Sequence, residues 1–448
     1  GAPRRRSQEA RTAPSQPPVQ GFMKTISAPN KAQYLRMLLL ACQHVMVMYA
    51  GAVAIPLVLG AALGLSKTDI AFLINADLFA CGIVTIIQAI GIGPVGIRMP
   101  VMMGVTFTAI GPMIAIGSDP SAGLSAIFGA TIAAGLFGLA MAPLVGKLLR
   151  FFPPVVTGTE IVAVGLSLMS VAAAWSAGGF GNAEFGRPLY LAIACAVLLC
   201  ILLIVRFTKG FLNNISVLLG LIFGFALSAG AGLVSLDGIE DAPVFGVILP
   251  FHFGMPTFHL WPMAAMCIVM LVTFIESTGM FIALGEIVDK PMDERTLVRG
   301  FRADALGTAV GGIFNTFPYT SYAQNIGLVS ITGVRSPWVC ALAGAILIVL
   351  GLFPKVAYFV ASIPPYVLGG AGIVMFGMVT ASGMKVLGRV VSPHFFSKLP
   401  SSLGPILESP ILLTAIVAIT LNIFFNGIGL RKPQNDAATG EGIGQHSN

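Results

Sequence analysis

The sequence has little charge. Of its 448 residues, 10% are charged and 56% are hydrophobic, and the mean hydropathy is +0.91. A soluble globular domain carries about 25% charged residues, so this composition excludes one. The apolar residues instead form repeated runs of about 20 residues, the length that a helix needs to cross a bilayer. We therefore predict an all-α polytopic membrane protein.

The sequence also lacks the motifs of nucleotide-driven pumps and of common enzymes. It contains no GxxxxGK[ST] loop, no HExxH and no GxSxG. The segment GIGPVG at 91–96 matches GxGxxG, but it follows an apolar run and contains Pro94, which is the wrong context for a dinucleotide fold. The six cysteines lie in apolar runs without a CxxC pair, which indicates packing residues. We predict that the protein is not an enzyme and uses no cofactor or metal.

The net charge of +7 follows the loops of a membrane protein. Apolar segments fall at about 36–60, 70–91, 97–117, 122–146, 154–175, 188–205, 213–234, 261–286, 298–313, 316–333, 337–353, 364–387 and 410–428. If the N-terminus is cytoplasmic, the inner loops hold most Lys and Arg residues, and the outer loops hold only Lys67, Arg187 and Lys355. This is the positive-inside pattern. We therefore predict a multi-pass protein of the inner (plasma) membrane with a cytoplasmic N-terminus and no nucleic-acid partner.

A long outer loop near the middle of the chain divides it into two halves. We assign residues 1–30, which are polar and rich in Arg and Pro, to a disordered cytoplasmic leader. The further divisions are a first repeat of seven spans at 31–234, an outer connecting loop at 235–260, a second repeat at 261–428 and a C-terminal tail at 429–448.

The third apolar segment of each half is interrupted. The first reads IRMPVMMGVTFTAIGPMIAIG at 97–117, and the second reads NTFPYTSYAQNIGLVSITG at 315–333. Interrupted segments at matching places in two halves indicate the binding site of a transporter. Broken helices would also expose backbone N–H groups and positive helix ends there. Helices that are merely kinked at glycine are the alternative.

Several ionisable residues lie inside or beside apolar runs, and for two of them, Asp77 and Glu160, we predict helix–helix contacts or a span end. Glu276 sits in CIVMLVTFIESTGMFIALG, where a charge costs at least about 2.5 to 3.5 kcal/mol on insertion scales. It is therefore either protonated or paired, and a carboxyl group that changes between these states carries a proton. Asp304 either belongs to such a network or pairs with Arg299 or Arg302 nearby. His44 either relays a proton or is a hydrogen-bonded packing residue.

The run QNIGLVSITG, from Gln324 to Gly333, has the form Q-N-x-G-x-x-x-x-T-G. This form resembles the signature of the nucleobase-ascorbate transporter family, also called nucleobase:cation symporter 2. The pair Gln43–His44, the segment FIESTGMF around Glu276 and Asp304 support the resemblance. It covers about residues 31–426 and is strongest to bacterial urate and xanthine permeases, especially the urate branch, in segments such as QHVMVMYAGAVAIPL and LFACGIVTIIQ.

The resemblance implies a fold of fourteen spans in two inverted seven-span repeats, divided into a core and a gate domain, and a homodimer. It also implies short strands in spans 3 and 10, with the substrate between them. One departure concerns span 13. The family has a further gate helix where this chain continues with VVSPHFFSKLP, so we predict that one gate span is missing near residues 390–408.

The resemblance also implies roles for individual residues. Glu276 would accept hydrogen bonds from ring N–H groups, and Gln324 would bind an oxo group and the adjacent N–H. His44, Asp304 and Asn325 would form the network for proton coupling and orientation. The remaining substrate contacts would come from Phe107 as a wall of the ring, Thr106 as a selectivity position, the backbone near Ala323 and the apolar side chain of Met280.

The function that the resemblance implies is import of an oxidised purine by a proton-coupled symporter that works by alternating access. Urate is the first candidate substrate and xanthine the second, because Gln at position 324 favours an oxopurine edge over uracil. An anion exchanger or channel with the same architecture, as in sulfate and bicarbonate carriers, is the alternative, although the QN signature is not typical of those proteins. A membrane-embedded enzyme is the third possibility.

Overall fold

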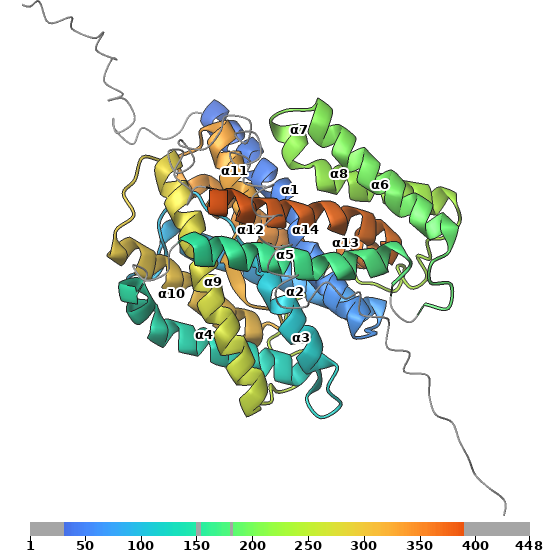
Figure 1. The fold of residues 1–448 in the computed structure, drawn as a ribbon, viewed down its shortest axis with the longest axis horizontal. Coiled ribbons are helices and arrows are strands. Elements are labelled where there is room, and N and C mark those ends of the chain that lie inside the picture. The colour runs from blue at the N-terminus through green and yellow to red at the C-terminus, as the bar shows by residue number, and fades with distance from the viewer. Residues whose placement is uncertain (1–30, 149–153, 180–181, 389–448) are drawn as a thin grey trace, which may run out of the picture.

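The computed structural model describes residues 31–148, 154–179 and 182–388 (Figure 1). The leader at 1–30, the predicted span at 410–428 and the predicted missing span near 390–408 lie outside these ranges. The first half forms α1 (Lys31–Ala62), α2 (Lys67–Ile90), β1 (Met103–Val105), the 3-10 helix η1 (Phe107–Ala109), α3 (Ile110–Gly117), α4 (Gly123–Leu148), α5 (Pro154–Ser176), α6 (Pro188–Phe207), α7 (Phe211–Asn214) and α8 (Ser216–Gly230). The second half forms α9 (Leu260–Ile287), α10 (Glu294–Ile313), β2 (Tyr319–Ser321), α11 (Ala323–Thr332), α12 (Pro337–Leu350), α13 (Pro354–Ala361) and α14 (Pro365–Gly388).

Within the described ranges the predicted apolar segments correspond to helices, except that 97–117 and 316–333 each combine a short strand with a short helix. Five helices of the described ranges are long and apolar enough to cross a membrane, and α12 with α13, bent by 85° at the break between them, would add a sixth. Several further apolar helices are shorter, among them α8. The total of thirteen spans therefore stays a prediction. The short helix α13 and the break between α7 and α8 are elements that the sequence pattern did not predict.

The packing of helices repeats between the two halves. Helix α4 of the first half packs against α9 and α10 of the second half. Correspondingly, α12 of the second half packs against α1 and α2 of the first half. The pairs β1–β2, α2–α10 and α5–α14 join elements that occupy the same place in each half. For these elements, exchanging each one for its counterpart in the other half reproduces the contact pattern, as expected for two structural repeats.

The described helices form two groups. The core group consists of α1 to α4, α9 to α13 and the two strands, which pack mainly on one another. The gate group consists of α5 to α8 and α14, in which α14 packs on α5, α6 and α8. Figure 1 shows α6, α7 and α8 on one side of the molecule and α4, α9 and α10 on the other, with α5 and α14 crossing its middle.

Glycine allows the closest helix contacts. A Cβ atom added to Gly344 on α12 would lie 2.7 Å from the carbonyl oxygen of Gly82 on α2, so these helices touch backbone to backbone. On the gate side, a Cβ atom at Gly165 of α5 would lie 2.9 Å from the carbonyl oxygen of Phe376 on α14. Small residues give membrane helices the close approach on which their packing depends. The dispersed glycines of the sequence are used in this way.

The two interrupted segments meet as an antiparallel ribbon at the centre of the core group. Met103 pairs with Ser321, Gly104 with Thr320 and Val105 with Tyr319. Side chains of neighbouring helices bind backbone N–H groups of the two strands. Thr85 Oγ1 accepts from Met103 N at 3.0 Å, and Thr308 Oγ1 accepts from Tyr319 N at 3.1 Å. Non-helical backbone at membrane depth requires such partners. The prediction of short strands is confirmed, and kinked continuous helices are excluded.

Candidate functional site

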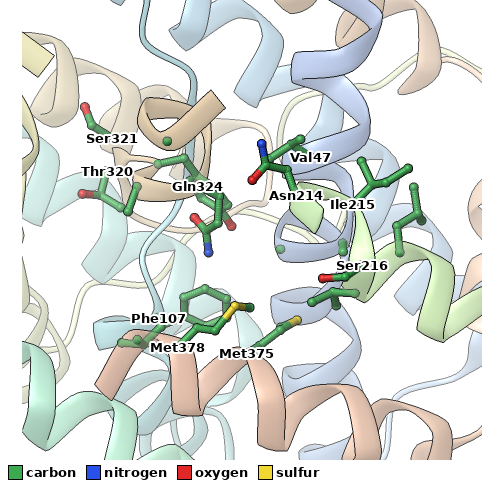
Figure 2. Close-up of a pocket in the computed structure, with 18 of the residues that line it drawn as sticks. Val47, Phe107, Asn214, Ile215, Ser216, Thr320, Ser321, Gln324, Met375 and Met378 are labelled. Atoms are coloured by element: carbon green, nitrogen blue, oxygen red, sulfur yellow. The ribbon is translucent and has the colours of Figure 1, made fainter. Parts of the chain in front are cut away.

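A cavity of about 280 Å³ lies between the core group and the gate group, beside the strand ribbon. Figure 2 shows Phe107 and Gln324 on the core side, facing Asn214, Ser216 and two methionines on the gate side. Its volume is just below the range of about 300 to 1,000 Å³ that is typical of ligand pockets. The wall is mainly apolar with a few polar groups, an arrangement that suits a small flat ring with polar edges.

Glu276, on α9, is half-buried and lines the cavity. Thr106 Oγ1 donates a hydrogen bond to Glu276 Oε2 at 3.0 Å. Thr106 is fully buried and is not among the cavity-lining residues, so it orients the carboxylate from behind. The ion pairs of the described residues, Arg187–Glu184 and Arg335–Asp289, are exposed and do not include Glu276. The alternative of a structural ion pair at Glu276 is thus not found in the described part.

Gln324 and Ala323 enter the cavity from the first turn of α11. The helix begins directly after β2, so its first backbone N–H groups have no partner within the helix and lie beside the cavity. The carboxamide of Gln324 points into the cavity in Figure 2. Met280, one turn after Glu276 on α9, contributes apolar wall. The cavity therefore brings together five of the six residues that the sequence assigned to substrate binding, namely Glu276, Met280, Ala323, Gln324 and Phe107.

Phe107 forms the side of the cavity next to the gate group. It lies in η1 and contacts Phe376 of α14, with ring centroids 5.8 Å apart and planes at 80°. This edge-to-face contact joins the core group to the gate group at the cavity wall. Phe107 is therefore placed to contact a bound ring and to respond to movement between the two groups.

Asp304 is fully buried on α10 and is bound by an amide rather than by a cation. Gln88 Nε2, on α2, donates to Asp304 Oδ1 at 3.0 Å and to Gly300 O at 3.2 Å. Gln88 Oε1 accepts from Ile97 N at 2.9 Å. Within the described ranges Asp304 forms no ion pair with Arg299 or Arg302, so that alternative from the sequence is wrong there.

His44 and Asn325 form a second buried contact. Asn325 Nδ2 donates to the His44 carbonyl oxygen at 2.9 Å and lies 3.1 Å from His44 Nδ1. The contact ties α1 to the first turn of α11, directly beside Gln324. The three residues predicted to form one network thus occupy two places, with His44 and Asn325 together and Asp304 beside Gln88. Their roles in proton coupling stay predictions.

Sequence reasoning missed several residues of the site. Gln88 could have been found, because it is a polar residue in the apolar run IVTIIQAIG. Tyr322 is 3% exposed and lines the cavity, with its ring held between Gly51 of α1 and Gly104 of β1. The wall supplied by α7, α8 and α14 had no local signal, since only the fold brings these distant segments to the ribbon.

Comparison with known proteins decides the family. A family model described as a permease family matches residues 35–392. The chain belongs to the nucleobase-ascorbate transporter family. It is 52% identical over 416 residues to the uric acid transporter UacT of Escherichia coli (strain K12), which covers 88% of this chain and 86% of that protein. It is 42% identical to the xanthine permease of Bacillus subtilis (strain 168), with 91% and 94% covered.

Solved structures show the same fold at low sequence identity. The transmembrane domain of the cyanobacterial bicarbonate transporter BicA gives a TM-score of 0.58 at 18% identity, with 89% of this chain and 98% of that domain covered. The murine anion transporter Slc26a9 gives a TM-score of 0.52 at 13% identity, with 90% and 74% covered. The predicted inverted-repeat fold is confirmed. As a member of the nucleobase-ascorbate transporter family, the chain is a multi-pass membrane transporter and not an enzyme.

Proposed function

We propose that this transporter imports an oxidised purine together with a proton, with urate as its first substrate and xanthine as its second. The observation that carries the proposal is that Glu276 of α9 and Gln324 of α11 line one cavity beside the strand ribbon. A carboxylate accepts hydrogen bonds from ring N–H groups, and a carboxamide both donates and accepts. Together they match an oxopurine edge, which alternates N–H donors with oxo acceptors in one plane.

The relatives support the choice of substrate. The 52% identity is to a protein named as a uric acid transporter, and the uric acid permease PucJ of Bacillus subtilis (strain 168) is 40% identical. The likeness to bicarbonate and anion transporters is limited to the fold, at 18% and 13% identity. The anion exchanger considered as an alternative is therefore not favoured.

The surroundings of Glu276 support the proposal of proton coupling. Its carboxylate has one hydrogen bond, from the neutral Thr106, and no cation partner in the described part. A charge held at such a depth is costly, so movement of the site across the membrane favours the protonated form. Coupling requires that the proton and the purine stabilise the same state. The membrane potential would add about 2.3 kcal/mol per charge per 100 mV.

Alternating access belongs to the same proposal. The cavity lies between the core and gate groups, so relative movement of the two groups would open it to one side of the membrane and then to the other. A homodimer in the inner membrane, with the N-terminus in the cytoplasm, completes the proposal and is supported by the family resemblance and the loop charges.

Uptake into proteoliposomes tests the proposal. Labelled urate is offered with and without an imposed inward proton gradient, and xanthine, uracil, bicarbonate and sulfate are added as competitors. We expect accumulation of urate only with the gradient, stronger competition by xanthine than by uracil, and none by the two anions. A protonophore should abolish accumulation. Exchange of bicarbonate or sulfate without purine uptake would support the anion carrier instead.

A further inference from the structure

The helical path is interrupted between α7 and α8, at the wall of the cavity. After Gly210, which has a φ of 68°, α7 makes one turn and ends at Asn214. Ile215 then leaves the helical path, with φ −96° and ψ 11°, before α8 starts at Ser216. Asn213 Nδ2 secures the break by donating to Val205 O at 2.9 Å. Both asparagines line the cavity, but Asn213 uses its amide for this internal bond.

The residue after Asn214 holds the break against the core group. Ile215 packs with Val47 of α1 and Leu328 of α11 in a hydrophobic cluster separate from the main core. The three side chains are between 0 and 6% exposed. Because α11 also carries Gln324 in its first turn, this cluster fixes the gate-side Asn214 opposite the core-side Gln324. Figure 2 shows the two carboxamides across the cavity from each other.

The amide of Asn214 has an unused donor. Its Nδ2 atom is buried and has no hydrogen-bond partner among the described residues. Leaving a buried donor unpaired is unfavourable. Rotation about χ2, a soft torsion in asparagine, would bring Nδ2 to the cavity. A ligand with an acceptor next to a donor would then satisfy both ends of the carboxamide.

We propose that Asn214 is the gate-side residue that reads the purine and that it selects urate over xanthine, an inference that rests on the proposed function. Glu276 and Gln324 would bind the dioxopyrimidine edge, which urate and xanthine share. Asn214 would then face the five-membered ring. In urate this ring presents N–H groups beside the C8 oxo group, and in xanthine it carries C–H at C8. At C8 itself the carboxamide therefore finds an oxo acceptor directly beside an N–H donor only in urate, since the C–H at C8 of xanthine accepts no hydrogen bond.

Binding measured on purified protein in detergent tests the inference, with labelled urate displaced by unlabelled urate or xanthine. For Asn214→Ala we expect urate affinity to fall about three- to tenfold, the effect of one lost hydrogen bond, and xanthine affinity to change less than twofold. Asn214→Asp has the same shape but no Nδ2 donor, so it should show the same loss of selectivity if the alanine variant does not fold. Asn182→Ala is the matched control, because this asparagine lies outside the cavity and its amide donates to Gly178 O at 3.1 Å, and it should keep the wild-type ratio of the two affinities.

Three results separate the possibilities. Equal loss of urate and xanthine binding in both Asn214 variants would mean a purely structural role and would overturn the inference. Unchanged binding, or the same change of ratio in Asn182→Ala, would overturn it too. If the wild-type protein bound neither purine, the proposed function itself would fail, and this is distinguishable because it does not depend on the variants.

Discussion

The packing of the Tyr322 ring between two glycines, Gly51 and Gly104, allows the effect of a glycine substitution to be predicted with a magnitude. Tyr322 precedes α11 and lines the cavity, and its ring passes between Gly51 and Gly104. A Cβ atom at Gly104 would lie 2.7 Å from Tyr322 Cζ and nearer still to two other ring carbons, whereas ordinary contact begins at 3.4 Å. The Cζ atom alone would have to move by 0.7 Å, and the other two atoms by more. The ring has little room to move, because Gly51 packs close to its other side: a Cβ atom added there would lie 2.7 Å from Tyr322 Cε1.

Gly104→Ala should therefore disturb both the fold and the site. Overpacking of this kind costs about 1 to 3 kcal/mol, which corresponds to about 5- to 150-fold in an equilibrium. We expect this loss to be divided between a lower melting temperature in detergent and weaker urate binding, since Tyr322 adjoins Ala323 and Gln324. Gly111→Ala, in the same interrupted segment, is the control, because nothing lies within 4 Å of a Cβ atom there.

A double-mutant cycle isolates the clash. In a Tyr322→Ala background the ring is gone, so adding Gly104→Ala should cost almost nothing in thermal stability. The reasoning is refuted if Gly104→Ala behaves like Gly111→Ala in both assays. It is also refuted if the cost of Gly104→Ala is the same with and without the Tyr322 ring.

Two further predictions concern buried polar contacts outside the cavity. Asn325→Ala removes both contacts to His44, so we expect a lower melting temperature and slower uptake. Unchanged values in both assays would contradict the view that these contacts hold α11 in place. Tyr319 Oη donates to Asp77 Oδ1 at 2.7 Å. Tyr319→Phe removes this donor from the buried carboxyl and should destabilise the protein by about 1 to 3 kcal/mol. Asp77→Asn keeps an acceptor for Tyr319 and should destabilise the protein less. The reverse order of the two variants in thermal denaturation would show that Asp77 is not held by Tyr319.

The sequence allowed good prediction of the fold where the signal is local. Proline and glycine in two otherwise apolar runs predicted the interrupted spans, because such residues break helices and a broken helix within a membrane needs partners. Glu276 and Gln324 stood out because polar groups are rare in apolar runs. Both predictions rest on chemistry that a single segment displays.

Features that depend on packing between distant segments could not be predicted. The contact of Thr106 with Glu276 is one of them, because the path of β1 turns the Thr106 side chain toward α9; its predicted role in selectivity stays a prediction. Asp304 was expected either in a proton network or beside arginine, and its partner is Gln88, more than 200 residues away. Asn214 looked like an ordinary polar residue at a loop, and only the break before α8 gives it a place in the cavity.

The most direct test of the account is accumulation of urate by Glu276→Gln in proteoliposomes with an imposed proton gradient. The substitution keeps the size of the side chain and the acceptor for Thr106 but cannot exchange a proton in this range. We predict that the variant inserts into the membrane, as measured by its abundance there, and loses gradient-driven accumulation completely. Accumulation that still responds to the proton gradient as in the wild type would contradict the assignment of Glu276 as the proton carrier.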